Sequence, residues 1–296
     1  LYDWKKMKKI IILIPVFNDW ESLKKLLIEI ENSIKKFPDL TIQCFVVNDA
    51  STIAKPEFKK PEKIDSLKIL NMKENRGHAR CNAFGIRYIT QNEKFDYLIL
   101  MDGDGEDRPS ELENLITKAL ENPNFSVVAK RVKRSEGLFF QSLYIMHKFI
   151  TYFFTGKKIN FGNYTCLTKK DAEIISSKPS LWSSYSGTVK KNLSNLLEIN
   201  SIRGARYFGP SKMSLFKLII HSFSIIAVFK FNVFLRSFFV ILLLFLLKSN
   251  LGIFALVIIS LLAIFNLMIL IVSFREQKED LLSSQANLKN ITNILH

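Results

Sequence analysis

A short acidic loop offers the clearest chemistry in this sequence. Residues 102–107 read Asp-Gly-Asp-Gly-Glu-Asp and directly follow the apolar residues 97–101. Two carboxylates one residue apart, Asp102 and Asp104, can share a divalent cation with a pyrophosphate, and hard oxygen ligands suit Mg²⁺ or Mn²⁺. Such a cation offsets the charge that builds on a leaving nucleotide diphosphate. Taken alone, the loop is equally well interpreted as an acidic cap on a helix that starts at Pro109. A calcium-binding EF-hand is disfavoured because the remaining ligand spacing is missing.

Two further segments place polar residues directly after an apolar run. Residues 14–19 read Ile-Pro-Val-Phe-Asn-Asp, and residues 47–52 read Val-Asn-Asp-Ala-Ser-Thr. A carboxylate at such a position can accept from a base imide or a ribose hydroxyl, and an adjacent aromatic ring can cover a base. Asn-Asp pairs are also ordinary turn and cap residues, so each segment alone is weak evidence. Combined with the acidic loop, the two segments indicate a nucleotide site.

The elements that must position these residues alternate along the first 130 residues. Apolar β-branched runs predict strands, and apolar residues at helical spacing predict helices between them. The strands are expected at residues 10–16, 41–47, 67–71, 97–101 and 125–129, and the helices at 19–36, 76–90 and 109–121. This alternation favours an α/β fold with a mainly parallel, doubly wound sheet. Ligands of such sheets bind beyond the carboxyl ends of the strands.

The C-terminal third has a different composition. Residues 214–229 place Ser214, Lys217, His221 and Ser224 on one narrow polar stripe, which predicts an amphipathic helix lying in a membrane interface. Residues 231–247 and 251–274 are strongly apolar, and the second run contains no charge and is long enough to cross a bilayer. The two runs predict a transmembrane helical hairpin. A buried pair of core helices is the alternative.

Basic residues flank this hairpin on both sides: Lys212, Lys217, Lys230 and Arg236 precede it, and Arg275 and Lys278 follow it. By the positive-inside rule both ends face the cytoplasm. The apolar run at residues 10–16 is too short for a signal peptide. We therefore expect a multi-pass protein of the cell's inner membrane, with the catalytic domain and both termini cytoplasmic. The expected parts are a domain at 1–212, a juxtamembrane helix at 213–230, the hairpin at 231–274 and a tail at 275–296.

Composition narrows the choice of partners. The 296 residues carry 42 basic and 27 acidic side chains, a formal net charge of +15. This excess fits a solvated lysine-rich surface, an anionic membrane surface or phosphorylated substrates. No motif for nucleic-acid binding is present, so no nucleic-acid partner is expected. Cys44, Cys81 and Cys166 are isolated, which argues against zinc sites and disulfides.

The order of these motifs resembles a family 2 inverting glycosyltransferase of the GT-A fold. It is most similar to the branch that contains dolichyl-phosphate mannose synthases and polyprenyl-phosphate glycosyltransferases, over about residues 8–275. The resemblance implies that Pro15, Phe17 and Asn18 form a wall of the nucleotide pocket. Asn48, Asp49 and Ser51 match the family's acidic pair and following serine, and Asp49 is expected to recognise the base because Asn48 replaces the first acid. Asn75, Gly77 and Ala83 match a helix start whose free amides could face the diphosphate; an ordinary helix cap is the alternative.

In the acidic loop, the resemblance implies that Asp102 contacts both the ribose and the metal. Asp104 is implied as the second metal ligand. Glu106 stands where mannose synthases often have glutamine, and it is implied as a third ligand on the metal side. Asp102, Asp104 and Arg131 are the residues on which catalysis is expected to depend.

Two basic segments match the family's acceptor site. Residues 130–134 read Lys-Arg-Val-Lys-Arg, and residues 209–212 read Gly-Pro-Ser-Lys just before the apolar third. The resemblance implies that Arg131, Arg134, Ser211 and Lys212 hold the acceptor phosphate, with Arg203 or Arg206 assisting. Guanidinium forks suit bidentate phosphate contacts. A solvated charge run and a basic patch on anionic lipid are the alternatives.

The resulting prediction is a metal-dependent membrane transferase that moves a sugar from a UDP- or GDP-sugar to a polyprenyl phosphate of the undecaprenyl or dolichyl type, with inversion. Such an acceptor is already anionic and needs no strong base. One alternative is a lipid or glycan hydroxyl as acceptor, with Asp107 as the base. Another, of a different class, is a non-catalytic membrane partner protein. The sequence leaves open the sugar, the base, and whether the chain forms a homo-oligomer.

Overall fold

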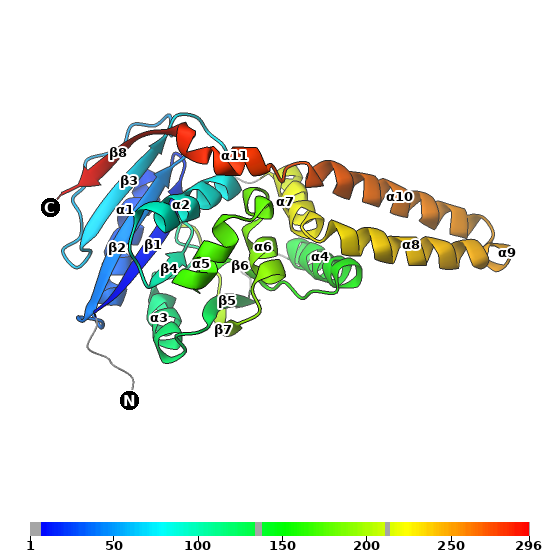
Figure 1. Ribbon diagram of the computed structural model, residues 1–296, viewed down its shortest axis with the longest axis horizontal. Helices are drawn as coiled ribbons and strands as arrows, with labels where there is room; N and C mark the ends of the chain where they lie inside the picture. Colours follow the sequence, from blue (N-terminus) through cyan, green and yellow to red (C-terminus); the bar gives the residue numbers. More distant parts are fainter. Residues whose placement is uncertain (1–6, 134–137, 211–213, 296) are drawn as a thin grey trace.

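The computed structural model describes residues 7–133, 138–210 and 214–295, and its centre is a mixed sheet (Figure 1). In these residues the strand order is β7-β5-β6-β4-β1-β2-β3-β8. The strands are β1 (Lys8–Val16), β2 (Leu40–Asn48), β3 (Ser66–Met72), β4 (Tyr97–Leu100), β5 (Ser126–Lys133), β6 (Phe161–Thr168), β7 (Leu196–Ile202) and β8 (Leu288–Ile294). The neighbours β3, β2, β1 and β4 are parallel, which confirms the predicted parallel core. The antiparallel strands β6 and β8 were not predicted.

Helices cover both faces of the sheet because its central strand is apolar on both sides. In β1 every residue from Ile10 onward is buried, as expected for a strand inside a parallel sheet. Ile10, Ile12 and Ile14 pack against α1 (Trp20–Ile34) and α3 (Leu112–Glu121). Ile11 and Leu13 face a second core formed with α2 (His78–Asn92), α5 (Lys169–Ser176), the short helix η2 (Pro179–Trp182) and α6 (Tyr185–Asn192).

The sheet departs from simple alternation after β4. The short helix η1 (Pro109–Glu111) and α3 lead to β5, and α4 (Leu138–Thr155) then leads to β6. β6 inserts between β4 and β5 and is antiparallel to both, so β5 is not the neighbour of β4. As a result, the amino end of β6 lies beside the carboxyl end of β4, where the acidic loop begins.

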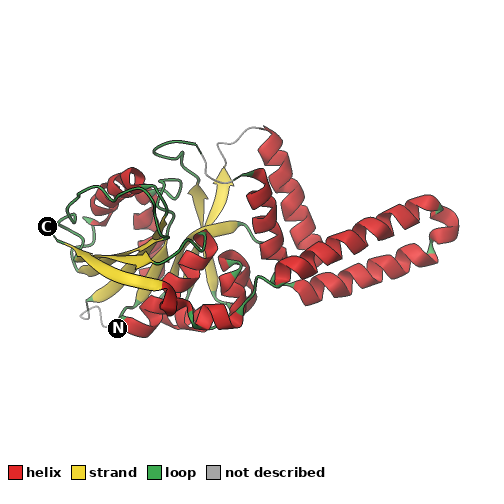
Figure 2. Ribbon diagram, turned by 90° about the horizontal axis from the view of Figure 1, so that it is seen from above, coloured by secondary structure: helices red, strands yellow, loops and turns green. Residues whose placement is uncertain are grey.

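Two long helices project from this α/β domain (Figure 2). α7 (Leu215–Ala227) meets α8 (Lys230–Leu246) at 87°, and α10 (Ile253–Ser273) returns alongside α8 after the short helix α9 (Lys248–Leu251). The helices predicted for this region are thus confirmed as helices. Ser214, Lys217 and His221 are exposed at the start of α7, whereas Ser224 of the predicted polar stripe is buried.

The projecting pair of α8 and α10 carries large apolar side chains on its exposed surface, among them Phe231, Phe238, Phe245, Phe254 and Leu261. Among the described residues, the segment that contains α10 is long and apolar enough to cross a membrane, and α7 with α8 passes the same test only as a bent pair. At the base of the pair, Phe154, Ile226, Val233 and Ile269 form a small buried cluster. This cluster fixes the helices to the α/β domain.

The segment after α10 rejoins the α/β domain. It forms α11 (Lys278–Leu282), the short helix η3 (Ser284–Asn287) and β8, which pairs antiparallel with β3 at the edge of the sheet (Figure 1). From the sequence, these residues were expected to form a tail. In the structure they complete the sheet, so the α8–α10 pair is an insertion between two parts of one domain.

Candidate active site

The acidic loop lies at the carboxyl end of β4, next to the end of β1, and two glycines give it its shape. A Cβ atom on Gly103 would lie 2.9 Å from the Pro15 carbonyl oxygen. Gly105 has φ +87°, and the ring of Tyr207 covers it so closely that a Cβ atom there would lie 2.5 Å from the ring. Only glycine combines this backbone conformation with this contact. The loop is therefore held between β1 and the segment that follows β7.

Asp102 contacts residues from two other elements. Its Oδ1 atom lies 3.0 Å from Nε2 of His78, at the start of α2, and accepts from Nδ2 of Asn163 on β6 at 3.1 Å. Burial opposes ionisation of Asp102, but the charge and hydrogen bond of His78, then Arg131, hold its pKa well below the usual range. In turn, desolvation lowers the pKa of His78, and the Asp102 carboxylate outweighs this effect and raises it. Asp102 is thus held as an anion.

The segment at residues 203–207 closes over the rest of the acidic loop. Arg206 Nη1 donates to Oδ2 of Asp104 at 2.6 Å, and Arg203 pairs with Glu106. Two backbone bonds align the segments: the Gly204 amide donates to the Glu106 carbonyl at 2.8 Å, and the Tyr207 amide donates to the Asp104 carbonyl at 2.9 Å. Burial, and then the Asp102 and Glu106 carboxylates, raise the pKa of Asp104 to about 6. The charges of Asp104 and Glu106 are therefore balanced by ion pairs with Arg206 and Arg203.

Asp107 is the last residue of the acidic loop and binds the backbone at its start. The residue is 4% exposed, its Oδ2 atom accepts from the Asp102 amide at 2.9 Å, and its Oδ1 atom lies 3.9 Å from Nη2 of Arg131. Burial, followed by the Asp102 carboxylate, raises the pKa of Asp107 to about 7. The Arg131 guanidinium also covers Gly162, where a Cβ atom would lie 2.5 Å from it. Arg131 thereby joins the acidic loop to β5 and β6.

The fit to a divalent cation can be tested on these oxygen ligands. The described residues contain no group of three His, Cys, Asp or Glu side chains arranged to hold a metal ion. The reason is visible in the pairs above, because Asp104 and Glu106 turn toward Arg206 and Arg203. Asp102 and Asp104 nevertheless offer hard oxygen atoms from one loop, the donor type that Mg²⁺ and Mn²⁺ prefer. The residues fit such a cation chemically, and Arg206 competes with it for Asp104.

Asn18 joins the ends of β1 and β2. It has φ 52°, its side-chain oxygen accepts from the Thr52 amide at 2.8 Å and from the Ile53 amide at 3.0 Å, and its own amide donates to Ser51 at 2.9 Å. Phe17 beside it is 39% exposed, and Pro15 is buried in β1. The structure thus brings the predicted nucleoside residues to one edge of the sheet.

Asp49 is more deeply placed than the sequence suggested. It is 3% exposed, and its two carboxylate oxygens accept from the Arg76 amide at 2.8 Å and the Gly77 amide at 2.9 Å. The expectation that free amides of the Asn-x-Gly segment face the diphosphate is therefore wrong for these two amides. Gly77 has φ +88°, which is not helical, and α2 begins with the next residue, His78. Base recognition by Asp49 stays a prediction.

A polar cavity of about 350 Å³ opens beside this edge. It is lined by Asn48, Ala50, Ser51, Asn71, Met72, Lys73, Lys289 and Asn290. Its wall contains a relay of amides, in which Asn48 Nδ2 donates to Asn71 at 2.9 Å and Asn71 Nδ2 donates to Asn290 at 2.8 Å. The relay runs from β2 through β3 to β8. Residues that follow the projecting helices therefore line a cavity at the predicted nucleotide edge.

The predicted acceptor residues are placed only in part. Arg131 lies beside the acidic loop, as described above, whereas Arg134, Ser211 and Lys212 lie outside the described residues. Neither His78 nor Asn163 was singled out from the sequence as a site residue. His78 follows the Asn-x-Gly segment directly, so its place at the start of a helix that reaches the site was a usable signal. Asn163 has no local signal, because only the insertion of β6 beside β4 brings it to Asp102.

Comparisons with known proteins identify relatives of this chain. Residues 11–172 match the family model described as glycosyl transferase family 2. An undecaprenyl-phosphate 4-deoxy-4-formamido-L-arabinose transferase of Yersinia enterocolitica is 29% identical over 226 residues, which cover 73% of this chain and 65% of that protein. A second enzyme of that name, from Salmonella choleraesuis, is 26% identical over 57% of this chain and 50% of its own. The chain thus spans about half to two thirds of the length of these curated relatives.

Solved structures with a similar fold are more distant in sequence. Mannosyl-3-phosphoglycerate synthase from Rubrobacter xylanophilus superposes with a TM-score of 0.52 at 12% identity, covering 75% of this chain and 72% of its own. Glucosyl-3-phosphoglycerate synthase from Mycobacterium tuberculosis, solved with Mn²⁺, UDP-glucose and phosphoglyceric acid, superposes with a TM-score of 0.50 at 13% identity, covering 76% and 80%. These likenesses establish the fold. With the family model matching more than half of the sequence, the chain belongs to glycosyl transferase family 2.

Proposed function

We propose that this protein transfers a sugar from a nucleotide-diphosphate sugar to a polyprenyl phosphate at a membrane surface. One observation carries the proposal: the domain that contains the acidic loop with Asp102 and Asp104 also carries a helix pair with large exposed apolar side chains. A transferase with a soluble acceptor has no use for such a pair, whereas an isoprenoid acceptor cannot leave the bilayer. The named activity of the curated relatives, an undecaprenyl-phosphate transferase, supports the same acceptor.

The donor is assigned to the edge formed by β1, β2 and β4. Pro15, Phe17, Asn18 and Asp49 hold the nucleoside, and the polar cavity beside Asn48 has room for part of it. Asp102 and Asp104, with Glu106 beside them, hold Mg²⁺ or Mn²⁺. When bound, that cation supplies positive charge to the departing diphosphate. His78 and Asn163 orient Asp102 for this task, since both contact the same carboxylate oxygen.

The acceptor phosphate is assigned to Arg131, Arg134, Ser211 and Lys212. Arg131 lies within 3.9 Å of Asp107 and so stands beside the acidic loop without a short ion pair to it. A phosphate monoester is anionic at neutral pH and can attack without a general base. Attack on the face opposite the diphosphate gives inversion in a single displacement.

The helix pair α8–α10 is assigned to the membrane as a hairpin, and α7 to its interface. The exposed phenylalanines and leucines of the pair would cost free energy in water and are compatible with lipid. Lys230 pairs with Glu276 at 3.2 Å at the base of the pair, and Arg236 Nη1 donates to the Phe153 carbonyl at 2.6 Å. These charged groups mark the level of the cytoplasmic surface. The catalytic domain and both termini are then on the cytoplasmic side.

A hydroxyl acceptor is the second candidate, and one observation favours it. The pKa of Asp107 is raised to about 7, which suits a general base. Its burial argues against this role, because both of its oxygens already face protein groups. Two variants separate the candidates. Loss of transfer in Arg131→Ala with retention in Asp107→Asn indicates a phosphate acceptor, and the reverse pattern indicates a hydroxyl.

The decisive experiment is a radiolabelled transfer assay in membranes that contain the full chain. It uses a panel of UDP- and GDP-sugars, with and without undecaprenyl phosphate and Mn²⁺ or Mg²⁺. A metal-dependent, mild-acid-labile lipid product that increases with added undecaprenyl phosphate is expected. Asp104→Asn should lower the rate at least about 100-fold, and the exposed acid Asp39 provides a matched control in Asp39→Asn. An acid-stable product that ignores undecaprenyl phosphate would overturn the proposed acceptor.

A further inference from the structure

The polar cavity at the ends of β2 and β3 is completed by β8, the edge strand that follows the helix pair (Figure 1). Its volume of about 350 Å³ falls within the roughly 300–1,000 Å³ of typical small-molecule sites. β8 contributes two of the lining residues, Lys289 and Asn290. The residues proposed above to hold the nucleoside come from β1 and from the end of β2. Lys289 and Asn290 therefore have no task in that assignment.

A shift of strand register lets these two consecutive residues line the same cavity. Neighbouring residues of a strand normally point to opposite faces of the sheet. Asn290 pairs with Asn71 of β3. Leu288 pairs with Met72, so the register skips Lys289, which has no partner residue on β3. Extra residues of this kind redirect side chains and are frequent next to active sites.

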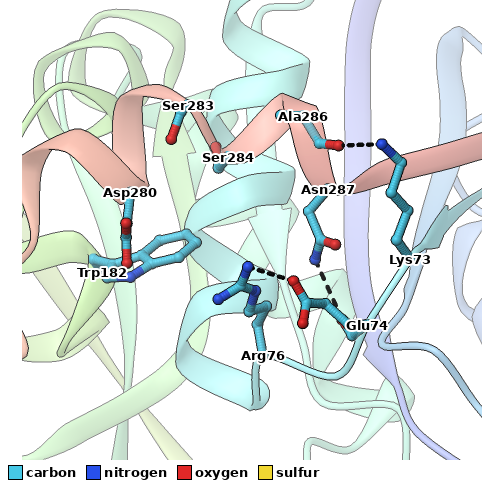
Figure 3. Close-up of a pocket in the computed structure, with 9 residues that line it drawn as sticks. All are labelled: Lys73, Glu74, Arg76, Trp182, Asp280, Ser283, Ser284, Ala286 and Asn287. Atoms are coloured by element: carbon cyan, nitrogen blue, oxygen red, sulfur yellow. Dashed lines mark hydrogen bonds and ion pairs between the residues drawn. The ribbon is translucent and has the colours of Figure 1, made fainter.

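The segment before β8 is held against the loop that follows β3. Lys73 Nζ donates to the Ala286 carbonyl at 2.7 Å, and the Lys73 amide donates to the Asn287 carbonyl at 2.7 Å. Asn287 Nδ2 in turn donates to the Glu74 carbonyl at 3.2 Å (Figure 3). The β8 wall of the cavity is thus fixed to the loop that supplies part of the β3 wall.

The relay of amides in this wall ends in a hydrogen-bond donor. The Ser51 backbone amide, which can only donate, binds the side-chain oxygen of Asn48 at 3.0 Å. This contact fixes the orientation of Asn48, so its Nδ2 atom donates to Asn71. Asn71 Nδ2 then donates to the side-chain oxygen of Asn290. In the described part of the chain, Nδ2 of Asn290 has no acceptor of its own and is left available to a ligand.

The charges around the cavity are positive. Lys73 and Lys289 line it, and no carboxylate of the described residues does. The smaller pocket drawn in Figure 3 differs, because two carboxylates line it beside two cations. Asp49 does not line the cavity, and its oxygens accept from amides of the loop before α2. The cavity therefore suits a ligand that presents mainly hydrogen-bond acceptors.

Among the bases of common sugar nucleotides, uracil meets this requirement better than guanine. The pairing edge of uracil has two carbonyl oxygens, which accept hydrogen bonds, and a single N–H group between them. The pairing edge of guanine has one carbonyl oxygen beside two donors, N1–H and the exocyclic amino group. Donors of the base that face donors of the protein stay unpaired, and this weakens binding.

We propose that Lys289 and Asn290 recognise the base of the sugar-nucleotide donor and select uracil over guanine. Nδ2 of Asn290 donates to one carbonyl oxygen of the base, and the Lys289 ammonium group donates to the other. The inference rests on the proposed function, because it names the base of that donor. It places donor selection partly on a strand that lies beyond the helix pair in the sequence.

Nucleotide affinity can be measured on the full chain in detergent by isothermal titration in the presence of Mn²⁺. The probes are UDP, GDP and pyrophosphate. We expect UDP to bind at least about tenfold more tightly than GDP. Lys289→Gln should weaken UDP binding about tenfold, the loss expected for a hydrogen bond to a charged group, and leave pyrophosphate binding unchanged. Asn290→Asp replaces a donor with an acceptor of the same shape, so it should weaken UDP binding and remove the preference for UDP over GDP.

Two control variants match these substitutions. Asn293→Asp makes the same change at an exposed residue of β8 that does not line the cavity, and it should bind UDP as the unmodified chain does. Lys24→Gln removes one positive charge from the exposed surface of α1 and should also leave UDP binding unchanged. Since Lys289 is exposed and has no partner residue on β3, Lys289→Gln should keep the midpoint of thermal unfolding. A weaker affinity in that variant then reports a lost contact with the ligand.

The transfer assay described above separates this inference from the proposed function. UDP binding that depends on Lys289 and Asn290 supports the inference even if no sugar reaches undecaprenyl phosphate. The inference is overturned if neither nucleotide binds, if GDP binds as tightly as UDP, or if both substitutions leave UDP affinity unchanged. It is also overturned if Lys289→Gln weakens pyrophosphate binding as much as UDP binding, because the cavity then holds a phosphate. A chain that transfers sugar yet gives one of the last three results retains the proposed function without this inference.

Discussion

Arg206 bridges Asp104 and Asp19, with one guanidinium nitrogen 2.6 Å from Asp104 Oδ2 and the other paired with Asp19 Oδ2. Asp19 precedes α1 and Asp104 follows β4, so a residue from beyond β7 ties together two strand ends of the donor edge. The same guanidinium forms an ion pair with Asp104, which is also a proposed ligand of the cation. The Arg206–Asp104 ion pair and the proposed cation would therefore compete for the same carboxylate.

The first prediction concerns this link. Arg206→Gln should tighten Mn²⁺ binding about tenfold, because a charge-assisted hydrogen bond contributes roughly 1.5–3 kcal/mol and 1.4 kcal/mol is a factor of ten. Mn²⁺ affinity can be measured by electron paramagnetic resonance in the absence of donor. Asp104→Asn in the same background should remove the gain. Unchanged or weaker Mn²⁺ binding in Arg206→Gln would show that Arg206 does not compete for the site.

Gly105 gives a second prediction. Gly105→Ala should destabilise the protein through both its backbone conformation and its contact with the Tyr207 ring. Gly77 is a matched control, since its φ of +88° is nearly the same and a Cβ atom there would meet nothing within 4 Å. Gly77→Ala should cost about 1–3 kcal/mol, and Gly105→Ala a further 1–3 kcal/mol or so from overpacking. Thermal unfolding in detergent measures both, and equal midpoints would contradict the ring contact.

The returning segment provides a third prediction. Leu281 of α11 is fully buried in the core that contains Trp182, whereas its neighbour Leu282 is 47% exposed. Leu281→Ala should destabilise the protein by about 2–5 kcal/mol, and Leu282→Ala by less than about 0.5 kcal/mol. The difference should appear as a lower midpoint of thermal unfolding for Leu281→Ala alone. Similar midpoints would mean that α11 does not dock as described.

Thiol reactivity supplies a pH-dependent prediction. Burial raises the pKa of Cys44 to about 12, with Lys60 opposing, and it also raises the pKa of Cys81 and Cys166. Only the thiolate reacts, and at pH 8 a thiol of that pKa is ionised to roughly one part in 10⁴. The native protein should therefore react very slowly with a disulfide reagent at pH 8 and faster as pH rises. All three thiols should react at once after denaturation, and rapid labelling of native protein at pH 8 would contradict their burial.

The sequence predicted the parts of the fold that rest on local pattern. The apolar run of β1 and the amphipathic spacing of α1 identified both elements, and the acidic loop was expected at a strand end, where it lies. The resemblance to family 2 glycosyltransferases is confirmed by the family model. Local pattern was sufficient here because each element buries its own apolar side chains.

Strand pairings and ion pairs between residues far apart in the sequence could not be predicted from local pattern. Nothing in residues 161–168 indicates that β6 inserts beside β4, and nothing in the polar run 288–294 indicates an edge strand on β3. Both depend on which partners the chain meets after folding. The pairing of Arg206 with Asp104 joins residues 102 positions apart, so the arginine appeared in sequence only as part of a basic segment. For this reason the resemblance implies that Asp104 and Glu106 are metal ligands, whereas the structure shows them in ion pairs with Arg206 and Arg203.

Because β8 pairs with β3, the sheet cannot acquire this edge strand until residue 294 has been synthesised. By then the ribosome has already produced both helices of the projecting pair. At roughly 5–20 residues per second, the 21 residues from Ser273 to Asn293 alone take about one to four seconds. During that interval the edge of β3 is open to other chains. The helix pair, which we propose enters a bilayer, is thus synthesised before the strand that completes the sheet of the catalytic domain.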